Sequence, residues 1–205
     1  MADVNALYSE LGSYLGELAK KFVDPHVPAS PTSVPSDYEF DVRAYCVLSH
    51  AAFEDFVEAV VLSLASDAVD RWTLNRKVTN VIVALLVWSG AKLKIDDDES
   101  SAEIKPFDYL RPLIHDAKAA FSREVYKNHG ISILHLRNLL IPVAIEIKQD
   151  ANLLNSLQKL AEGRGHYAHK GRVTSVLAPE DARQYVQDVL ALCDDISAKV
   201  IAAST

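Results

Sequence analysis

Apolar side chains recur every three or four residues along most of the chain, which is the spacing that places them on one face of an α-helix. The first stretch with this spacing spans residues 3–23 and includes Leu7, Leu11 and Leu15. Four prolines then fall within residues 24–35. Because proline has no amide hydrogen and a fixed φ, this segment is expected to form a loop.

Two long helices are predicted next, over residues 38–66 and 67–89. Gly90 follows directly, and glycine is favoured just past the end of a helix. Polar side chains spaced four residues apart form a stripe on the first of these helices, at His50, Glu54 and Glu58. Residues four apart share one helix face, so we expect this stripe to face something other than hydrocarbon.

The second half of the chain has the same helical spacing in shorter stretches. Residues 107–127 are expected to be helical, and Ser132 can cap a short helix that bends or ends near Pro142. A further helix is expected over residues 150–162, and Pro179 suits the first position of the last one. No stretch alternates apolar and polar residues as a strand would, so the sequence predicts an all-α bundle of about six to seven helices.

Length and composition indicate one globular domain. The chain has 205 residues, 49% apolar and 24% charged, which is enough for a core without disulfides or a structural metal. We expect a single domain over residues 1–205, in which 1–37 form an N-terminal helix and loop and 38–205 form the core bundle. Cys46 and Cys193 lie outside any CxxC or CxxH spacing, so buried thiols are expected and no metal or other cofactor.

Nothing in the sequence points to a membrane or to secretion. The apolar stretch at residues 78–88 is much shorter than the roughly 20 residues that a membrane-spanning helix needs, and it is expected to be a core helix. Residues 1–15 lack the basic segment followed by an apolar one that marks a secreted chain. We therefore expect a cytoplasmic protein with no membrane partner. The acidic residues 96–99 are expected to form a solvated loop.

Basic residues gather in one short segment of an acidic chain. The formal net charge is −7, which opposes general adhesion to nucleic acid, because phosphate binding depends on basic side chains. Between Lys159 and Arg172, however, four basic residues stand against the single acid Glu162, so this segment is net +3 without its histidines. Any nucleic-acid site must therefore be local, and this segment is the candidate.

The same segment carries a recognisable motif. Arg164 and His169 are separated by four residues, and this Rx4H spacing resembles the signature of the HEPN superfamily of helical domains, many of which are ribonucleases. Tyr167 and Ala168 precede the histidine, and an aromatic or aliphatic residue followed by alanine is similar to the RiboL-PSP type of HEPN domain. The resemblance implies a helical bundle and an RNA-directed activity.

Two further blocks carry the resemblance over about residues 38–200. The segment His50-Ala-Ala-Phe-Glu54 resembles the early-helix pattern of the family with its acidic residue. The segment Asn128-His-Gly-Ile-Ser132, followed by Leu136–Pro142, resembles its central part. The family often has a polar residue, typically asparagine, directly after the arginine, whereas this chain has Gly165. That difference bears on the local hydrogen bonding of the motif.

The residue types suit RNA cleavage without a metal. This reaction needs a base for the 2′-hydroxyl proton, an acid for the leaving 5′-oxygen, and a cation for the charge on the phosphorane. Histidine accepts and donates protons near neutral pH, because its ordinary pKa is about 6.5. The planar guanidinium of arginine binds two phosphate oxygens at once.

Helix geometry limits what one copy of the motif can do. Residues five apart point about 140° away from each other on an ideal helix. Arg164 and His169 therefore need the long reach of the arginine, or a break that Gly163 and Gly165 can supply. The family resemblance implies another solution, in which two copies dimerise and place two motifs in one cleft. His166 lies three residues before His169, on nearly the same face, and can take part.

Plainer interpretations stay open beside these. The basic residues can simply decorate a solvated helix start, and His166 can be an exposed imidazole or one of a metal-binding pair with His169. Glu54 can orient the arginine or histidine of the site, or it can pair with a charge on a neighbouring helix. Lys170 and Arg172 can contact RNA phosphates or form an exposed basic pair.

The resemblance and the chemistry together favour one function. We expect a metal-independent endoribonuclease that acts at a homodimer cleft, leaves 2′,3′-cyclic phosphate ends, and serves as a toxin or defence effector held in check by a protein partner. Its catalytic residues are then Arg164, His169, His166 and Glu54. The alternative is a non-catalytic HEPN module that binds RNA or a protein through the same cleft.

Overall fold

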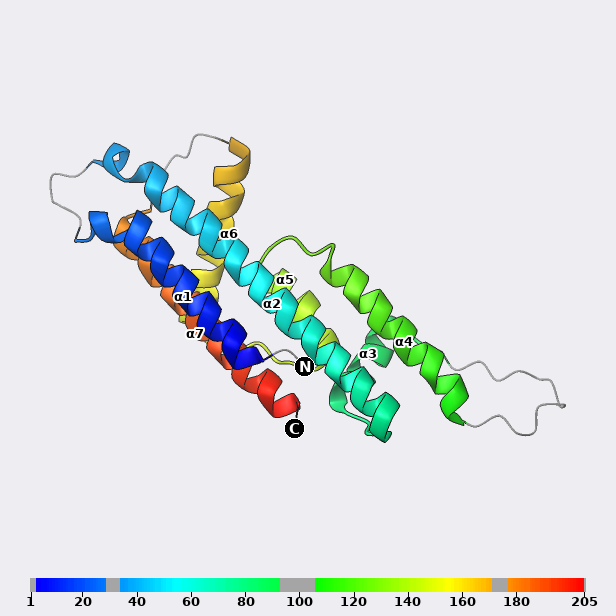
Figure 1. The fold of residues 1–205 in the computed structure, drawn as a ribbon. Helices are drawn as coiled ribbons and strands as arrows, with labels where there is room; N and C mark the ends of the chain where they lie inside the picture. Colours follow the sequence, from blue (N-terminus) through cyan, green and yellow to red (C-terminus); the bar gives the residue numbers. More distant parts are fainter. Residues whose placement is uncertain (1–2, 29–33, 93–105, 171–176, 205) are drawn as a thin grey trace.

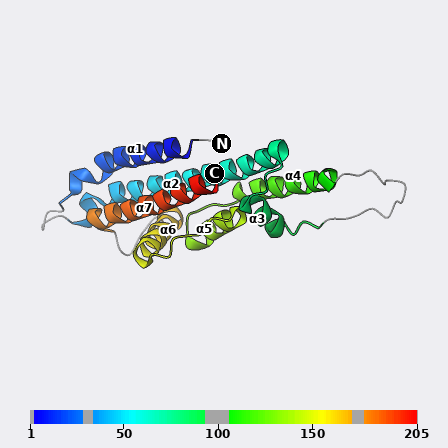
Figure 2. The same cartoon turned by 90° about the horizontal axis from the view of Figure 1, so that it is seen from below.

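The computed structural model describes residues 3–28, 34–92, 106–170 and 177–204, and for 106 and 164–170 only the backbone. Within these residues it contains seven α-helices, three short 3-10 turns and no strand, so the all-α prediction is confirmed. Figure 1 shows an elongated bundle, and Figure 2 shows the same bundle from below. None of the described helices combines the length and the apolar character needed to cross a membrane. The acidic run at 96–99 lies outside the described residues.

Helix α2 is the axis of the bundle. It spans Glu39–Asn75 and packs against every other α-helix. Helices α1 (Val4–Phe22) and α7 (Pro179–Ala203) lie along its first half, side by side in both Figures 1 and 2. These three helices share a buried apolar face, which includes Leu11, Leu15, Phe53, Val60, Val189, Leu192 and Ile196.

The predicted boundary between residues 66 and 67 is wrong, because α2 continues to Asn75. The inward spacing of apolar residues continues through this point to Trp72, so nothing ends the helix there. It ends where Arg76 adopts the left-handed conformation, with φ of 60°. Thr79 then caps a separate helix, α3 (Asn80–Ser89), by accepting from the amide of Ile82 at 3.3 Å.

Helix α3 ends as predicted at Gly90, whose φ is 66° and whose amide donates to carbonyls of the last turn. The core helix expected at residues 78–88 is present as α3, but only one of its faces is buried. One face of α3, with Val81, Ile82 and Leu85, is buried, whereas Val83 and Val87 are exposed. Helix α3 therefore carries apolar side chains on both its buried and its exposed face.

Two further helices follow α3 and also pack against α2. Helix α4 (Pro106–Val125) packs against α2 and α3. Helix α5 (Ile133–Leu140) begins at Ser132, as predicted, where the serine hydroxyl accepts from the amide of His135 at 3.5 Å. A 3-10 turn that contains Pro142 ends it.

Helix α6 (Ala151–Lys170) is longer than predicted, because it continues past the expected end at residue 162. Glycine in a helix interior costs about 1 kcal/mol relative to alanine, yet Gly163 and Gly165 do not interrupt it. Asp150 caps its start by accepting from the amides of the first turn. Helix α7 begins at Pro179, as predicted. The buried thiols predicted at the two cysteines are also confirmed.

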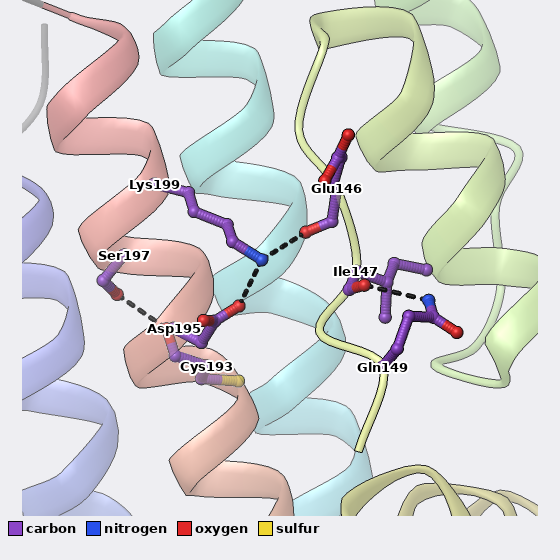
Figure 3. A network of polar contacts seen from close by, with 7 residues as sticks. All are labelled: Glu146, Ile147, Gln149, Cys193, Asp195, Ser197 and Lys199. Atoms are coloured by element: carbon purple, nitrogen blue, oxygen red, sulfur yellow. Dashed lines mark hydrogen bonds and ion pairs between the residues drawn. The ribbon is translucent and has the colours of Figure 1, made fainter. Parts of the chain in front are cut away.

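The extended segment before α6 is held by Lys199 of α7. Its Nζ donates to the carbonyl of Glu146 at 2.8 Å and lies 2.7 Å from a carboxylate oxygen of Asp195 (Figure 3). Next to this clamp the Gln149 side chain donates to the carbonyl of Ile147 at 3.0 Å, and Ser197 donates to the carbonyl of Cys193 within α7. The clamp thus fixes the approach of the chain to α6.

Lys199→Met keeps most of the side-chain length but removes this donor. We expect it to lower the free energy of unfolding by about 1 kcal/mol, since a carbonyl and a carboxylate lose their partner at a partly exposed site. Urea unfolding followed by circular dichroism measures the change. The matched control is Lys148→Met, because Lys148 is exposed on the same segment and makes no hydrogen bond or ion pair with described residues. Equal stability of the two variants would contradict a clamp.

Candidate functional site

The Rx4H motif lies in the last two turns of α6. Positions 164, 166, 169 and 170 all belong to this helix, while residue 172 lies outside the described residues. The side chains of 164–170 also lie outside the description, so the assignment of Arg164, His166, His169, Lys170 and Arg172 to a site stays a prediction. In Figure 1 the end of α6 that carries the motif projects beyond the edge of α2.

Buried contacts hold the first half of α6 in place. Leu157 and Leu160 are buried, and the Ser156 hydroxyl donates to a carboxylate oxygen of Asp188 on α7 at 2.5 Å. Helix α6 packs against α2 as well as α7. The motif therefore lies in the last turns of a helix whose first half is anchored in the core.

The continuous helix changes how the motif can work. A break at the two glycines was one of the predicted ways to bring Arg164 and His169 together, and α6 has no such break. The two positions are then about 140° apart around the helix axis. What remains is the reach of the arginine side chain or a second copy of the motif. Positions 166 and 169, by contrast, are three residues apart and lie on nearly one face.

Glu54 lies on α2, the helix that α6 crosses. Its Oε2 is 3.7 Å from Nδ1 of His50, which is one turn earlier on the same helix and only 2% exposed. This separation is longer than a hydrogen bond but allows attraction when the imidazole is protonated. The Glu54 side chain keeps 16% of its surface exposed. Its predicted role toward Arg164 or His169 stays a prediction.

Glu58, one turn further along α2, has a polar environment. Burial raises its pKa, as does repulsion from Glu54 and Asp55, while His129 and a hydrogen bond with the Asn128 side chain act in the opposite direction. Both of these partners belong to the connection between α4 and α5. The expectation that the polar stripe faces something other than hydrocarbon is thus confirmed at Glu58.

The same connection forms a pocket that sequence reasoning missed. Its volume is about 290 Å³. The lining comes from the end of α4, the connection and one face of α5, with Glu124, Lys127, Asn128, His129, His135, Asn138 and Leu139. The sequence did contain one signal for this pocket, which is the spacing of three residues between Ser132 and His135. In the structure Nδ1 of His135 lies 2.7 Å from the serine hydroxyl. We name this feature the α4–α5 pocket.

Possible metal ligands do not cluster in the described part of the chain. No three side chains of histidine, cysteine, aspartate or glutamate come together there as a metal site. The His166 and His169 side chains are not among those described, so a metal pair at that place is not addressed by this observation.

The sequence model of the RiboL-PSP-HEPN family matches residues 13–202, which is nearly the whole chain and includes the Rx4H motif. Neither the curated proteins nor the solved structures contain a match.

Proposed function

The chain belongs to the RiboL-PSP-HEPN family, and from this membership we propose that it is a metal-independent endoribonuclease that works as a homodimer. The observation that carries the proposal is the Rx4H motif, which the family match includes and which occupies the projecting end of α6. The local charge supports it, since the segment from Lys159 to Arg172 is net +3 in a chain that is net −7. The first attraction of RNA is therefore expected at this end of the molecule.

The proposed reaction is attack of the ribose 2′-oxygen on the adjacent phosphorus. His169 of one copy takes the 2′-hydroxyl proton as the new P–O bond forms. His169 of the second copy donates a proton to the 5′-oxygen as its bond to phosphorus breaks. Arg164 binds the phosphoryl oxygens as negative charge grows on them. The products are a 2′,3′-cyclic phosphate and a free 5′-hydroxyl, and no metal or other cofactor takes part.

The geometry of α6 supports a shared cleft. A regular helix separates positions 164 and 169 by about 140°, so one copy offers its arginine and its histidine in different directions. Two copies facing each other can supply both proton-transfer groups to one phosphate. His166 assists beside His169 in this proposal, Glu54 orients the basic residues from α2, and Lys170 and Arg172 bind flanking phosphates.

We further propose that this cleavage is restrained in the cell. The proposal therefore includes a neutralising protein partner and a role as a toxin or defence effector. The glycine that follows the motif arginine supports the alternative of a non-catalytic module, because Gly165 lacks the polar side chain that the family often has there. Such a module would use the same cleft to hold RNA or a protein.

The test is cleavage of RNA in excess EDTA, with mapping of the product ends. We expect cutting to persist without metal, to leave 2′,3′-cyclic phosphate ends, and to stop at any position that carries a 2′-deoxyribose, because the nucleophile is then missing. Light scattering of the same sample should give the mass of a dimer. Loss of cutting in EDTA contradicts the mechanism, and a monomer contradicts the shared cleft. Salt-sensitive retardation of RNA without cutting favours the binding module.

A further inference from the structure

The α4–α5 pocket contains an imidazole that is held in one orientation. Nδ1 of His135 lies 2.7 Å from the Ser132 hydroxyl, and the ring rests against the backbone of Gly130. A Cβ at Gly130 would be 3.1 Å from two ring atoms, and its φ of 150° is one that other residues rarely adopt. Serine and glycine thus fix the ring, and Nε2 is the ring nitrogen left without a hydrogen bond to described residues.

Two carboxamides line the same pocket as this ring. The Asn128 side chain donates to the carbonyl of Gly130 at 3.1 Å and hydrogen-bonds Glu58, which ties the connection to α2. Asn138 differs, because it lines the pocket, is exposed, and makes no hydrogen bond with described residues. A carboxamide offers two donors and one acceptor. The pocket therefore presents a fixed imidazole and an unused amide to the same space.

The charge of the pocket suits a neutral ligand. Lys127 and Glu124 lie 3.8 Å apart and offset each other. A phosphate would need an excess of basic groups, and apart from the histidines the lining has one base, Lys127, against one acid, Glu124. The buried Leu139 adds an apolar wall. A flat ring with hydrogen-bonding edges and apolar faces fits this combination better than a phosphate does, and the bases of single-stranded RNA are read through such contacts.

The pocket also lies close to Glu54, the α2 residue of the proposed site. Glu58, which Asn128 contacts, is four residues from Glu54 on α2, and residues four apart share one helix face. In Figure 1 the connection between α4 and α5 lies beside the middle of α2. The connection that borders the pocket thus lies about one helical turn along α2 from Glu54.

We infer that the α4–α5 pocket binds one unstacked base of the RNA and so sets a preference for where the strand is cut. The inference rests on the proposed function for its link to cleavage. Nε2 of His135 and the carboxamide of Asn138 bond the edge of the base, while Leu139 and the exposed imidazole of His129 border its faces. The site is a specificity subsite, and its residues take no part in proton transfer.

The test uses AMP, CMP, GMP and UMP one at a time, with inorganic phosphate as the comparison ligand, and follows binding to the full chain by NMR titration. We expect at least one nucleotide to bind and to shift the signals of Asn138 and His135, and phosphate not to do so. Asn138→Ala should weaken this binding about tenfold, because one polar edge contact is lost. Leu134→Ala, an exposed change on the same helix outside the pocket, should bind like the wild type.

The outcomes separate this inference from the proposed function. Three results would overturn the base site, whatever happens to RNA. The wild type binds no nucleotide, the wild type and Asn138→Ala bind nucleotides with equal affinity, or phosphate shifts the signals of Asn138 and His135 as much as a nucleotide does. If RNA is cut, Asn138→Ala should also flatten the preference among cleavage positions, and an unchanged pattern overturns the subsite while the ribonuclease stands. Nucleotide binding that depends on Asn138, without any RNA cleavage, supports the base site and contradicts the proposed ribonuclease activity.

Discussion

His169→Ala is expected to slow RNA cleavage by about 10²–10⁴-fold, which is the usual contribution of a positioned general acid or base. Both proton transfers of the proposed reaction depend on this side chain, one in each copy of a dimer. The change lies in the last turn of α6, away from the anchored first half of that helix. Single-turnover rates in EDTA, with protein in excess over labelled RNA, measure the effect on the chemical step.

Two variants serve as controls for this prediction. Arg164→Ala should also reduce the rate strongly, since the charge on the phosphorane loses its cation. Arg164→Lys should recover part of the lost rate, because lysine keeps the charge but not the two-pronged geometry. Equal rates for wild type, His169→Ala and Arg164→Ala would mean that a contaminating nuclease cuts the RNA, and the enzyme proposal would then fail.

Phe53→Ala should have the largest effect on stability, about 3–5 kcal/mol less free energy of unfolding. Phe53 is fully buried in the middle of α2, where its removal leaves a cavity that neighbouring helices cannot fill. Phe40→Ala is a matched control, because it changes the same residue type in the same helix at a side chain that is 77% exposed. Urea unfolding midpoints at constant m-value give both changes. Similar losses for the two variants would show that α2 does not organise the core.

The sequence predicted a helix end correctly where the residue at that end itself starts or stops the helix. Ser132 caps α5, Gly90 ends α3 and Pro179 begins α7, each by a bond or a backbone restriction that belongs to that residue. The predicted boundary at residue 66 had no such signal. The true end of α2 is a left-handed arginine, Arg76, which local sequence does not mark because arginine rarely adopts that φ.

The end of α6 was mispredicted for a related reason. Two glycines lower the intrinsic preference for helix after residue 162, but helix propensity is a weak term beside packing. The contacts of Leu157 and Leu160 with the rest of the core start the helix firmly, and it continues through Gly163 and Gly165. Those contacts join segments distant in sequence, so no local pattern could reveal them.

The same distinction applies to the candidate site, of which only the part formed by residues close in sequence could be predicted. The Rx4H motif and the basic segment are visible in the sequence because their residues are neighbours in it. The α4–α5 pocket was not visible as a pocket, because it needs the turn at Gly130 to bring Asn128 and His129 to the face of α5 that carries His135, and needs Glu58 of α2 to hold Asn128. Only the folded backbone brings these groups together.

The packing of α7 against α1 and α2 has a consequence for synthesis of the chain. Helices α1 and α2 leave the ribosome early, but their common apolar face is completed by α7, which is made only after α3–α6. At about 5–20 residues per second this face stays uncovered for several seconds or longer. We expect the nascent chain to present it to chaperones during that interval, and the core to close only when Val189, Leu192 and Ile196 have been added.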